Sequence, residues 1–281
     1  MLARGSREPR RLPTEAVHVK AGQAVGASRR FDPRGAPSIG FALAAAVRRG
    51  RQSRGFVLNL TDLLIVAPVL LFSMVAHEYA HGYAALRQGD PTAYQLGRLT
   101  FNPVKHIDPF MTIILPVMTA LTGGFIFGGA KPVPVDPRNY RNFRRGDIIV
   151  SLAGIATNLV LAAVCAALIV PLGMLGRALP AATTSLAILQ EMMRAGVMFN
   201  LILAFFNLLP IPPLDGSHVA KYLLPPAWGL RYAQLGRFGF LIVLLFLTVG
   251  RGVLAIWMAP AGALNAVATT LVSQYLLPDP L

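Results

Sequence analysis

Cysteine is almost absent from the chain, and this absence rules out two kinds of stabilisation. Cys165 is the only cysteine among 281 residues. A single thiol can neither close an internal disulfide nor build a thiolate zinc cluster. Because Cys165 lies in an apolar run, we interpret it as a small core residue.

Charged residues are also scarce, which argues against water as the solvent around most of the chain. Only 14% of the residues are charged, 54% are hydrophobic, and the mean hydropathy is +0.56. Soluble globular domains carry about 25% charged residues. We therefore expect an all-α polytopic membrane protein with four to six transmembrane helices.

Acidic residues are the rarer charges, and the basic excess is concentrated near the N-terminus. Residues 1–56 carry twelve Lys or Arg against three acids, within a net charge of +14. Residues 1–35 lack apolar periodicity, and the apolar run 39–47 is short and followed by two arginines, so we interpret it as an interfacial segment at most. We therefore expect a basic, disordered tail at 1–55, without a signal peptide, before a membrane domain at 56–281. The tail has no folded basic face and no interleaved aromatics, so we expect no nucleic-acid partner. Membrane lipids with anionic headgroups explain its charge more simply.

Six apolar stretches are candidates for membrane segments. About 20 helical residues, at 1.5 Å each, cross roughly 30 Å of hydrocarbon. The stretches are residues 56–86, 110–127, 148–172, 197–209, 238–247 and 261–277. Pro116 and Gly123-Gly124 interrupt the second stretch, so we expect it to be re-entrant or only partly inserted. The polar connections at 89–108 and 128–147 are rich in turn residues and strand formers, so we expect short strands or loops that line the site.

One polar motif interrupts the first apolar stretch: His77-Glu78-Tyr79-Ala80-His81. Histidines at i and i+4 of a helix lie on one face, about 6 Å apart, so both imidazoles can bind one zinc ion while the intervening glutamate activates a water. The motif alone occurs by chance in unrelated proteins. Its location adds weight, because an ionisable residue at the centre of a transmembrane helix costs at least about 2.5–3.5 kcal/mol. The alternative is a polar seam between helices, in which Glu78 pairs with a histidine.

A catalytic zinc needs a third protein ligand and leaves its fourth position to water. The best candidate is Asp215, at the end of Asn207-Leu208-Leu209-Pro210-Ile211-Pro212-Pro213-Leu214-Asp215. Prolines break the helix, and irregular backbone at membrane depth is tolerated only where it is buried in protein or lines a cavity. We therefore expect this stretch to face the site. Alternatively it is an ordinary loop in which Asp215 caps the next helix.

Together the two motifs resemble the site-2 protease family of intramembrane zinc metalloproteases, peptidase family M50, in its small members without PDZ or CBS domains. The resemblance covers about residues 58–258. It includes Gly89-Asp90-Pro91-Thr92-Ala93, Gly97-Arg98-Leu99-Thr100-Phe101-Asn102-Pro103, His106-Ile107-Asp108-Pro109 and Gly129-Ala130-Lys131-Pro132-Val133-Pro134-Val135. The chain departs from the family at Gly154-Ile155, where Gly-Pro is usual, and we interpret Asn158 as a buried packing or hydrogen-bonding group.

The resemblance implies one zinc ion per chain, bound by His77, His81 and Asp215. It implies Glu78 as the general base and acid, and Asn207 as a polar group near the scissile peptide. The implied activity is hydrolysis of peptide bonds in or near transmembrane segments of membrane-protein substrates. The implied location is a bacterial-type cell membrane, as a multi-pass protein.

Two other functions remain open at this point. A membrane-anchored protease with its domain in water would take its third ligand from a later glutamate, and Glu191 is the only one. A non-enzymatic metal carrier or transporter would use the histidine motif as an ion site. Of the other polar residues, we expect a structural or gating role for His106 with Asp108. His218 is either a hydrogen-bond partner of a metal ligand or, as we favour, a residue on the polar face of the next helix.

Overall fold

The computed structural model of the protein describes residues 60–114 and 128–280. Within these ranges the ordered elements are helical. The α-helices are α2 (Leu60–Gln88), α3 (Thr92–Gln95), α5 (Phe143–Ala178), α6 (Thr183–Asn207), α7 (Asp215–Ala220), α8 (Pro226–Gln234), α9 (Gly239–Thr248) and α10 (Arg251–Val272). Shorter helical turns are η1 (Pro103–His106), η2 (Pro109–Ile114), η3 (Pro137–Asn139), η4 (Pro180–Ala182), η5 (Lys221–Leu223), η6 (Leu235–Phe238) and η7 (Ser273–Tyr275). The predicted tail at 1–55 lies outside the described residues.

Five helical stretches are long and apolar enough to cross a membrane. They are Leu64–Gln88, Phe143–Ala178, Pro180–Asn207, Pro226–Thr248 and Arg251–Tyr275. The second is the most apolar, with a mean hydropathy of 2.5 in its best window. The number falls within the predicted four to six, and the helical class is confirmed for the described part of the chain.

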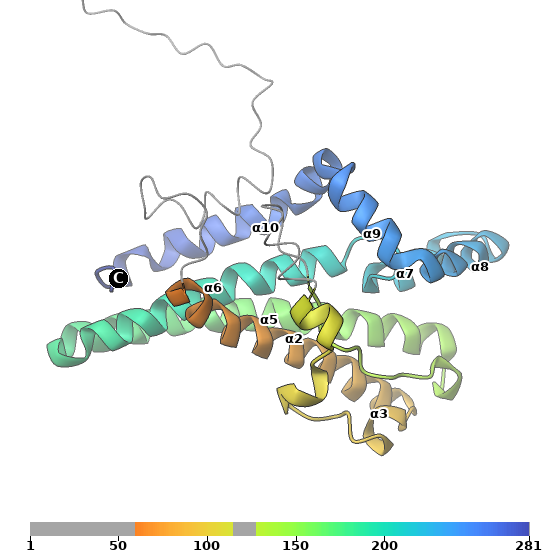
Figure 1. Ribbon diagram of the computed structural model, residues 1–281, viewed down its shortest axis with the longest axis horizontal. Coiled ribbons are helices and arrows are strands. Elements are labelled where there is room, and N and C mark those ends of the chain that lie inside the picture. Colours follow the sequence, from red (N-terminus) through yellow and green to blue (C-terminus); the bar gives the residue numbers. More distant parts are fainter. Residues whose placement is uncertain (1–59, 115–127, 281) are drawn as a thin grey trace, which may run out of the picture. The chain divides into compact units, whose positions relative to one another are not determined.

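Helices α2, α5 and α6 pack against one another at the centre of the fold (Figure 1). The N–H of Arg141 donates to Gln88 O at 2.8 Å, so α5 begins beside the end of α2 and runs back along it. Because only the turn η4 separates α5 from α6, α6 returns towards the end of α2. Helix α5 thus runs away from the end of α2 and α6 runs back towards it. The chain that leaves α6 is therefore at the level of the histidine motif.

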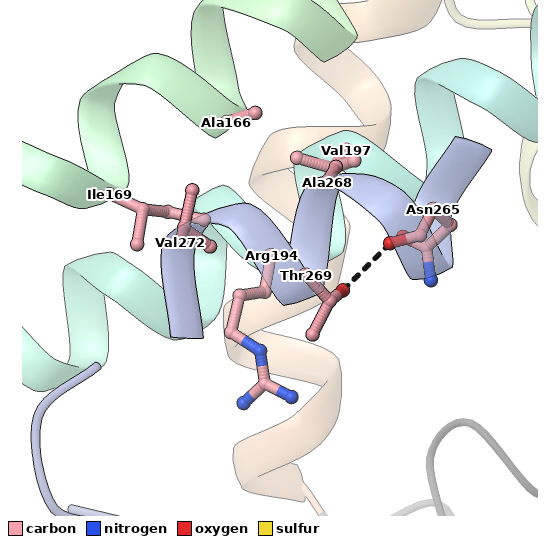
Figure 2. Close-up of a pocket in the computed structure, with 8 residues that line it drawn as sticks. All are labelled: Ala166, Ile169, Arg194, Val197, Asn265, Ala268, Thr269 and Val272. Carbon is pink, nitrogen blue, oxygen red and sulfur yellow. Dashed lines mark hydrogen bonds between the residues drawn. The ribbon is translucent and has the colours of Figure 1, made fainter. Parts of the chain in front are cut away.

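Helix α10 packs on α6 and α5 through small apolar side chains. The buried residues at this contact are Ala162, Val197, Leu201 and Ala261. Figure 2 shows a small pocket in the same contact, with Arg194 of α6 beside Asn265 and Thr269 of α10. The Thr269 hydroxyl donates to Asn265 O within its own helix, and Arg194 pairs with Glu191 at 2.5 Å. Thr269 and Arg194 thus bond within their own helices.

Of the short strands or loops expected at 89–108 and 128–147, the short β element is not present in the described residues, where these connections are loops with short helical turns. The backbone there bonds to side chains and to isolated carbonyls. The N–H of Val133 donates to Glu78 Oε2 at 2.8 Å, and the N–H of Lys131 donates to His106 O at 2.8 Å. Each N–H thus meets a different element, so no ladder between neighbouring strands forms.

The predicted re-entrant segment at 110–127 lies mostly outside the described residues. Its described start belongs to η2, a π-helical turn. Thr112 Oγ1 donates to Gly129 O at 2.7 Å, so the chain before and after the segment lies at one place. A re-entrant segment requires this closeness, and the re-entrant path stays a prediction.

Asp90 joins the two polar connections just beyond the end of α2. It is fully buried, and its carboxylate accepts hydrogen bonds from Thr92 N–H and Oγ1, from Asn139 Nδ2 at 2.9 Å and from Asp136 N–H at 2.6 Å. Burial alone raises the pKa of Asp90, but these hydrogen bonds outweigh burial and hold the pKa below its usual value. The ionised carboxylate therefore ties the segment after Val133 to α2.

We predict that Asp90→Asn lowers the free energy of unfolding by about 1–3 kcal/mol at neutral pH, because an amide nitrogen would then face the N–H of Asp136. The lowered pKa gives the sign of the pH dependence. The stabilisation by Asp90 is present above the usual carboxyl pKa and is lost as pH falls through the folded-state pKa. Denaturant unfolding in detergent should show that the free energies of unfolding of Asp90→Asn and wild type become more similar as the pH is lowered.

Asp136→Asn is the matched control. The Asp136 carboxylate pairs with the exposed Arg138 and accepts from its N–H, a bond that an amide oxygen can still accept. Asp136→Asn should therefore change the free energy of unfolding little. If the free energies of unfolding of Asp90→Asn and wild type differ by the same amount at every pH, the role assigned to the Asp90 charge is contradicted.

Candidate metal centre

Three side chains able to bind a metal meet at one point: His77, His81 and Asp215. His77 Nε2 lies 2.9 Å from His81 Nε2, and Asp215 Oδ2 lies 3.1 Å and 3.2 Å from these two nitrogens. Tetrahedral ligand atoms about 2.0–2.1 Å from zinc lie about 3.3 Å from one another. The three donor atoms are thus close to the separations that zinc requires.

Two different elements supply these ligands. The helical spacing of α2 places the histidines on one face, as predicted. Asp215 is the first residue of α7, which follows the proline-rich segment 208–214 after α6. This segment turns the chain back towards the helices instead of continuing α6, so Asp215 arrives at the level of the histidines.

A buried carboxylate near the start of α5 holds α7 in place. Asp147 Oδ1 accepts from His218 Nδ1 at 3.2 Å, and Oδ2 accepts from Tyr222 Oη at 2.7 Å and pairs with Lys221 Nζ at 2.5 Å. All three partners lie within seven residues of Asp215. Asp147 therefore anchors the short helix that carries the third ligand.

The proton positions on the two histidines follow from their other ring nitrogens. His81 Nδ1 lies 2.7 Å from the carbonyl oxygen of Val150, and His77 Nδ1 lies 2.5 Å from Asn158 Oδ1. These oxygens can only accept, so each Nδ1 carries a proton and donates. In the neutral imidazoles both Nε2 atoms then present lone pairs towards each other and towards the carboxylate of Asp215.

Three acceptors converging within 3.2 Å repel one another unless a cation lies among them. The carboxylate of Asp215 supplies the anionic member of this group. Two neutral imidazoles and one carboxylate are a donor set suited to catalytic zinc. The residues therefore fit the metal.

Glu78 is held next to this cluster by a backbone group. Its Oε2 accepts the N–H of Val133 at 2.8 Å. One turn further along the same face of α2, Gly82 provides the space for this contact, because a Cβ there would lie 2.9 Å from Val133 Cγ1. The carboxylate beside the first histidine is thus fixed by the extended segment that follows Gly129.

Gly154 of α5 lies directly against both imidazoles. A Cβ at this position would lie 2.5 Å from His81 Nε2 and 2.6 Å from His77 Nε2. Real Cβ atoms do not approach other heavy atoms this closely. The absence of a side chain at Gly154 keeps open the space towards which the ligand atoms point.

The structure places the other predicted residues as follows. Asn207 ends α6, and its Nδ2 donates to Leu203 O at 2.9 Å, so one of its two amide protons is used within the helix. His106 is fully buried and bonds through Nε2 to Thr100 O, in keeping with a structural role. Glu191, the alternative third ligand, pairs with Arg194 and is not part of the cluster.

Several residues around the site were missed. Sequence reasoning gave no role to Ser73, Asp147 and Asn200, and none at the metal site to Gly154. A usable signal existed for Asn200, because an amide within an apolar helix needs partners. No such signal existed for Gly154, since a glycine in a helix becomes informative only when its neighbours are known.

The fold and site together define a class: membrane zinc metalloproteases with a His-Glu-X-X-His helix and a later aspartate ligand. Comparison with known sequences gives the family. A sequence model of Peptidase family M50 matches residues 65–247. The chain belongs to peptidase family M50, the site-2 protease type, and is a zinc metalloprotease.

Named relatives are bacterial. The chain is 37% identical over 202 residues to "Putative zinc metalloprotease YwhC" of Bacillus subtilis, a match covering 72% of this chain and 87% of the relative. It is 35% identical over 191 residues to "Putative zinc metalloprotease Rip2" of Mycolicibacterium smegmatis, covering 66% of each chain. Rip2 of Mycobacterium tuberculosis is 33% identical over 180 residues, covering 62% of this chain and 63% of the relative. No solved structure gives a significant match.

We predict that Gly154→Ala removes zinc from the purified protein, because the added methyl group would occupy the space between the imidazoles. Zinc per chain, measured by elemental analysis after purification in detergent, should fall well below one. Gly262→Ala is the control, since a Cβ at Gly262 of α10 has no heavy atom within 4 Å. Wild-type zinc content in a folded Gly154→Ala protein would show that the metal does not lie where the three ligands meet.

Proposed function

We propose that the chain is an intramembrane protease that hydrolyses peptide bonds in or near transmembrane segments of membrane-protein substrates. One observation carries the proposal: the cluster of His77, His81 and Asp215, with Glu78 beside it, is held by helices apolar enough to cross a membrane. A substrate that reaches this site must come from within or next to the bilayer. The bacterial relatives support a location in a bacterial-type cell membrane, as a multi-pass protein.

His77, His81 and Asp215 would hold one zinc ion per chain. When bound, zinc would polarise both the attacking water and the substrate carbonyl. The two imidazoles are oriented for this by their Nδ1 hydrogen bonds to Asn158 and Val150. Asp215 supplies the third ligand and leaves the fourth side of the cluster for water.

Glu78 is the general base in this proposal. The bond from Val133 N–H occupies Oε2 and fixes the carboxylate, so Oε1 is the oxygen that accepts the proton of the attacking water. The same oxygen then delivers the proton to the leaving amine nitrogen. Asn207, through its second amide proton, would help to hold the oxyanion of the tetrahedral intermediate.

Water must reach a site at this depth. A cavity of about 130 Å³ adjoins α7, with Ser217, His218, Lys221 and Tyr232 among its lining residues. Its size gives room for several water molecules, and its polar side chains can bind them. We infer that this cavity supplies water to the side of the site next to Asp215.

The substrate helix must unwind to expose a peptide bond. The extended segment 131–135 lies against Glu78 through Val133, and no neighbouring strand pairs with it in the described residues. Such a segment can add an extended substrate by backbone hydrogen bonds. We propose that it aligns the unwound part of the substrate beside the general base, with membrane lipids around the complex.

We predict that Glu78→Gln keeps about one zinc per chain and abolishes cleavage of a transmembrane substrate, because an amide cannot accept the proton of the attacking water. Purified wild type and variant would be compared by elemental analysis and by a cleavage assay in detergent. Full activity of Glu78→Gln would rule out the mechanism.

Two further variants make the result specific. Asp215→Ala should lose zinc as well as cleavage, because it removes a ligand. Glu191→Gln should keep both, because Glu191 pairs with the partly exposed Arg194 away from the cluster. Zinc transport without proteolysis by wild type would favour the metal carrier instead.

A further inference from the structure

Three uncharged polar side chains are buried between α2, α5 and α6, one turn away from the metal site. Ser73, Asn158 and Asn200 have relative exposures of 1%, 0% and 1%. Burying an amide without partners in an apolar region costs a few kcal/mol. These three side chains avoid that cost by forming hydrogen bonds with one another. Which side chain donates and which accepts is fixed at each of these bonds.

A backbone carbonyl of α6 sets the donor and acceptor roles. Asn200 Nδ2 donates to Gly196 O at 2.8 Å and to Ser73 Oγ at 2.8 Å. Ser73 Oγ itself donates to Val69 O at 2.8 Å, so its oxygen is left to accept from Asn200. Since Gly196 O can only accept, turning the amide of Asn200 around would lose this bond and set Asn200 Oδ1 against the carbonyl oxygen of Gly196.

The orientation of Asn200 then fixes that of its neighbour. With its nitrogen directed at Gly196, Asn200 presents Oδ1 to Asn158 and accepts from Asn158 Nδ2 at 2.8 Å. Asn158 must therefore present Oδ1 on its other side, where it lies 2.5 Å from His77 Nδ1. An oxygen at that position requires the proton of a neutral His77 to be on Nδ1.

We propose that Asn200 is a positioning residue for metal binding: by fixing the amide of Asn158, it holds His77 in the tautomer whose Nε2 lone pair faces the metal. The relay consists of Gly196 O, Asn200, Asn158 and His77, and it rests on the proposed zinc site. If Asn158 turned around, its Nδ2 would face His77 Nδ1. The proton would then move to Nε2, where it blocks metal binding.

His81 needs no such relay. Its Nδ1 donates directly to the carbonyl of Val150, whose polarity cannot reverse. His77 lies opposite a side-chain amide, whose two ends differ in polarity but hardly in shape. At His77, by contrast, the 2.8 Å bond from Asn158 Nδ2 to Asn200, with a longer one of 3.5 Å to Ser73 O, decides which end of the amide faces the ring.

The test is a double-mutant cycle on zinc affinity in the full chain, measured in detergent by competition with a chelator. Its members are wild type, Asn200→Leu, Asn158→Asp and the double variant. A carboxylate at 158 presents an oxygen to His77 however it turns, so it no longer needs Asn200. Outer hydrogen-bond partners of metal ligands typically change affinity 10–100-fold, which sets the scale of the effect.

We expect Asn200→Leu to weaken zinc binding about 10–100-fold in the wild-type background. In the Asn158→Asp background the same substitution should have no further effect on affinity. The absorption spectrum of bound Co²⁺ should be altered in Asn200→Leu and close to wild type in the double variant. Gln190→Leu is the matched control, because it also removes a buried amide from α6, where Gln190 bonds to Ile169 O and Tyr275 O, away from the relay. It should keep wild-type affinity.

Two results would overturn the relay. One is an equal loss of affinity from Asn200→Leu in both backgrounds, which would mean a packing role. The other is no loss at all. If Asn200→Leu does not fold, Asn158→Asp and Asn158→Leu test the same polarity: aspartate should keep affinity and leucine lower it about 10–100-fold, and equal losses would refute the relay.

Zinc binding by wild type separates this inference from the function on which it rests. A wild-type chain that binds no zinc would refute the proposed function. A wild-type chain that binds zinc and cleaves substrate, with variants that do not follow the cycle, would refute only the role of Asn200.

Discussion

The convergence of three hydrogen-bond acceptors between apolar helices is the constraint on which the rest of the structure depends. The Nε2 lone pairs of His77 and His81 and the carboxylate of Asp215 lie within 3.2 Å of one another. Their side chains are only 9–21% exposed, so little water is present to screen their repulsion and the arrangement needs a cation. A metal bound there would join α2 to α7 through these side chains, and the same charge would provide the chemistry.

The surrounding polar groups serve to keep these acceptors in place. Each histidine is oriented through Nδ1, directly by Val150 O at His81 and through Asn158 at His77. Asp147 holds α7, and Val133 N–H holds Glu78. Most of these contacts join segments far apart in the sequence, so the site forms only when α2, α5 and α7 are packed. A rigid set of partners of this kind suits a reaction that depends on oriented charge.

The sequence was sufficient for the features that are local or periodic. Apolar length predicted the helical membrane fold, and the i, i+4 spacing predicted that both histidines share a face. Asp215 required the second motif, because nothing in its own neighbourhood separates a metal ligand from a helix cap. The sequence left short strands or loops open at 89–108 and 128–147, because β-branched residues and turn signals do not show whether a neighbouring strand exists. At Val133 the available partner was the carboxylate of Glu78. Gly154 could not be assigned because its role arises from contacts across helices. Asn200 carried the signal of an amide that needs partners, but the sequence did not show which partners these are.

X-ray absorption at the zinc edge of the purified protein tests the central claim most directly, because it reports the ligand atoms around the metal. We predict two imidazole nitrogens and two oxygens, one from Asp215 and one from water, at about 2.0–2.2 Å, with no sulfur. A sulfur shell near 2.3 Å, a coordination number of six, or fewer than two imidazoles would contradict the account.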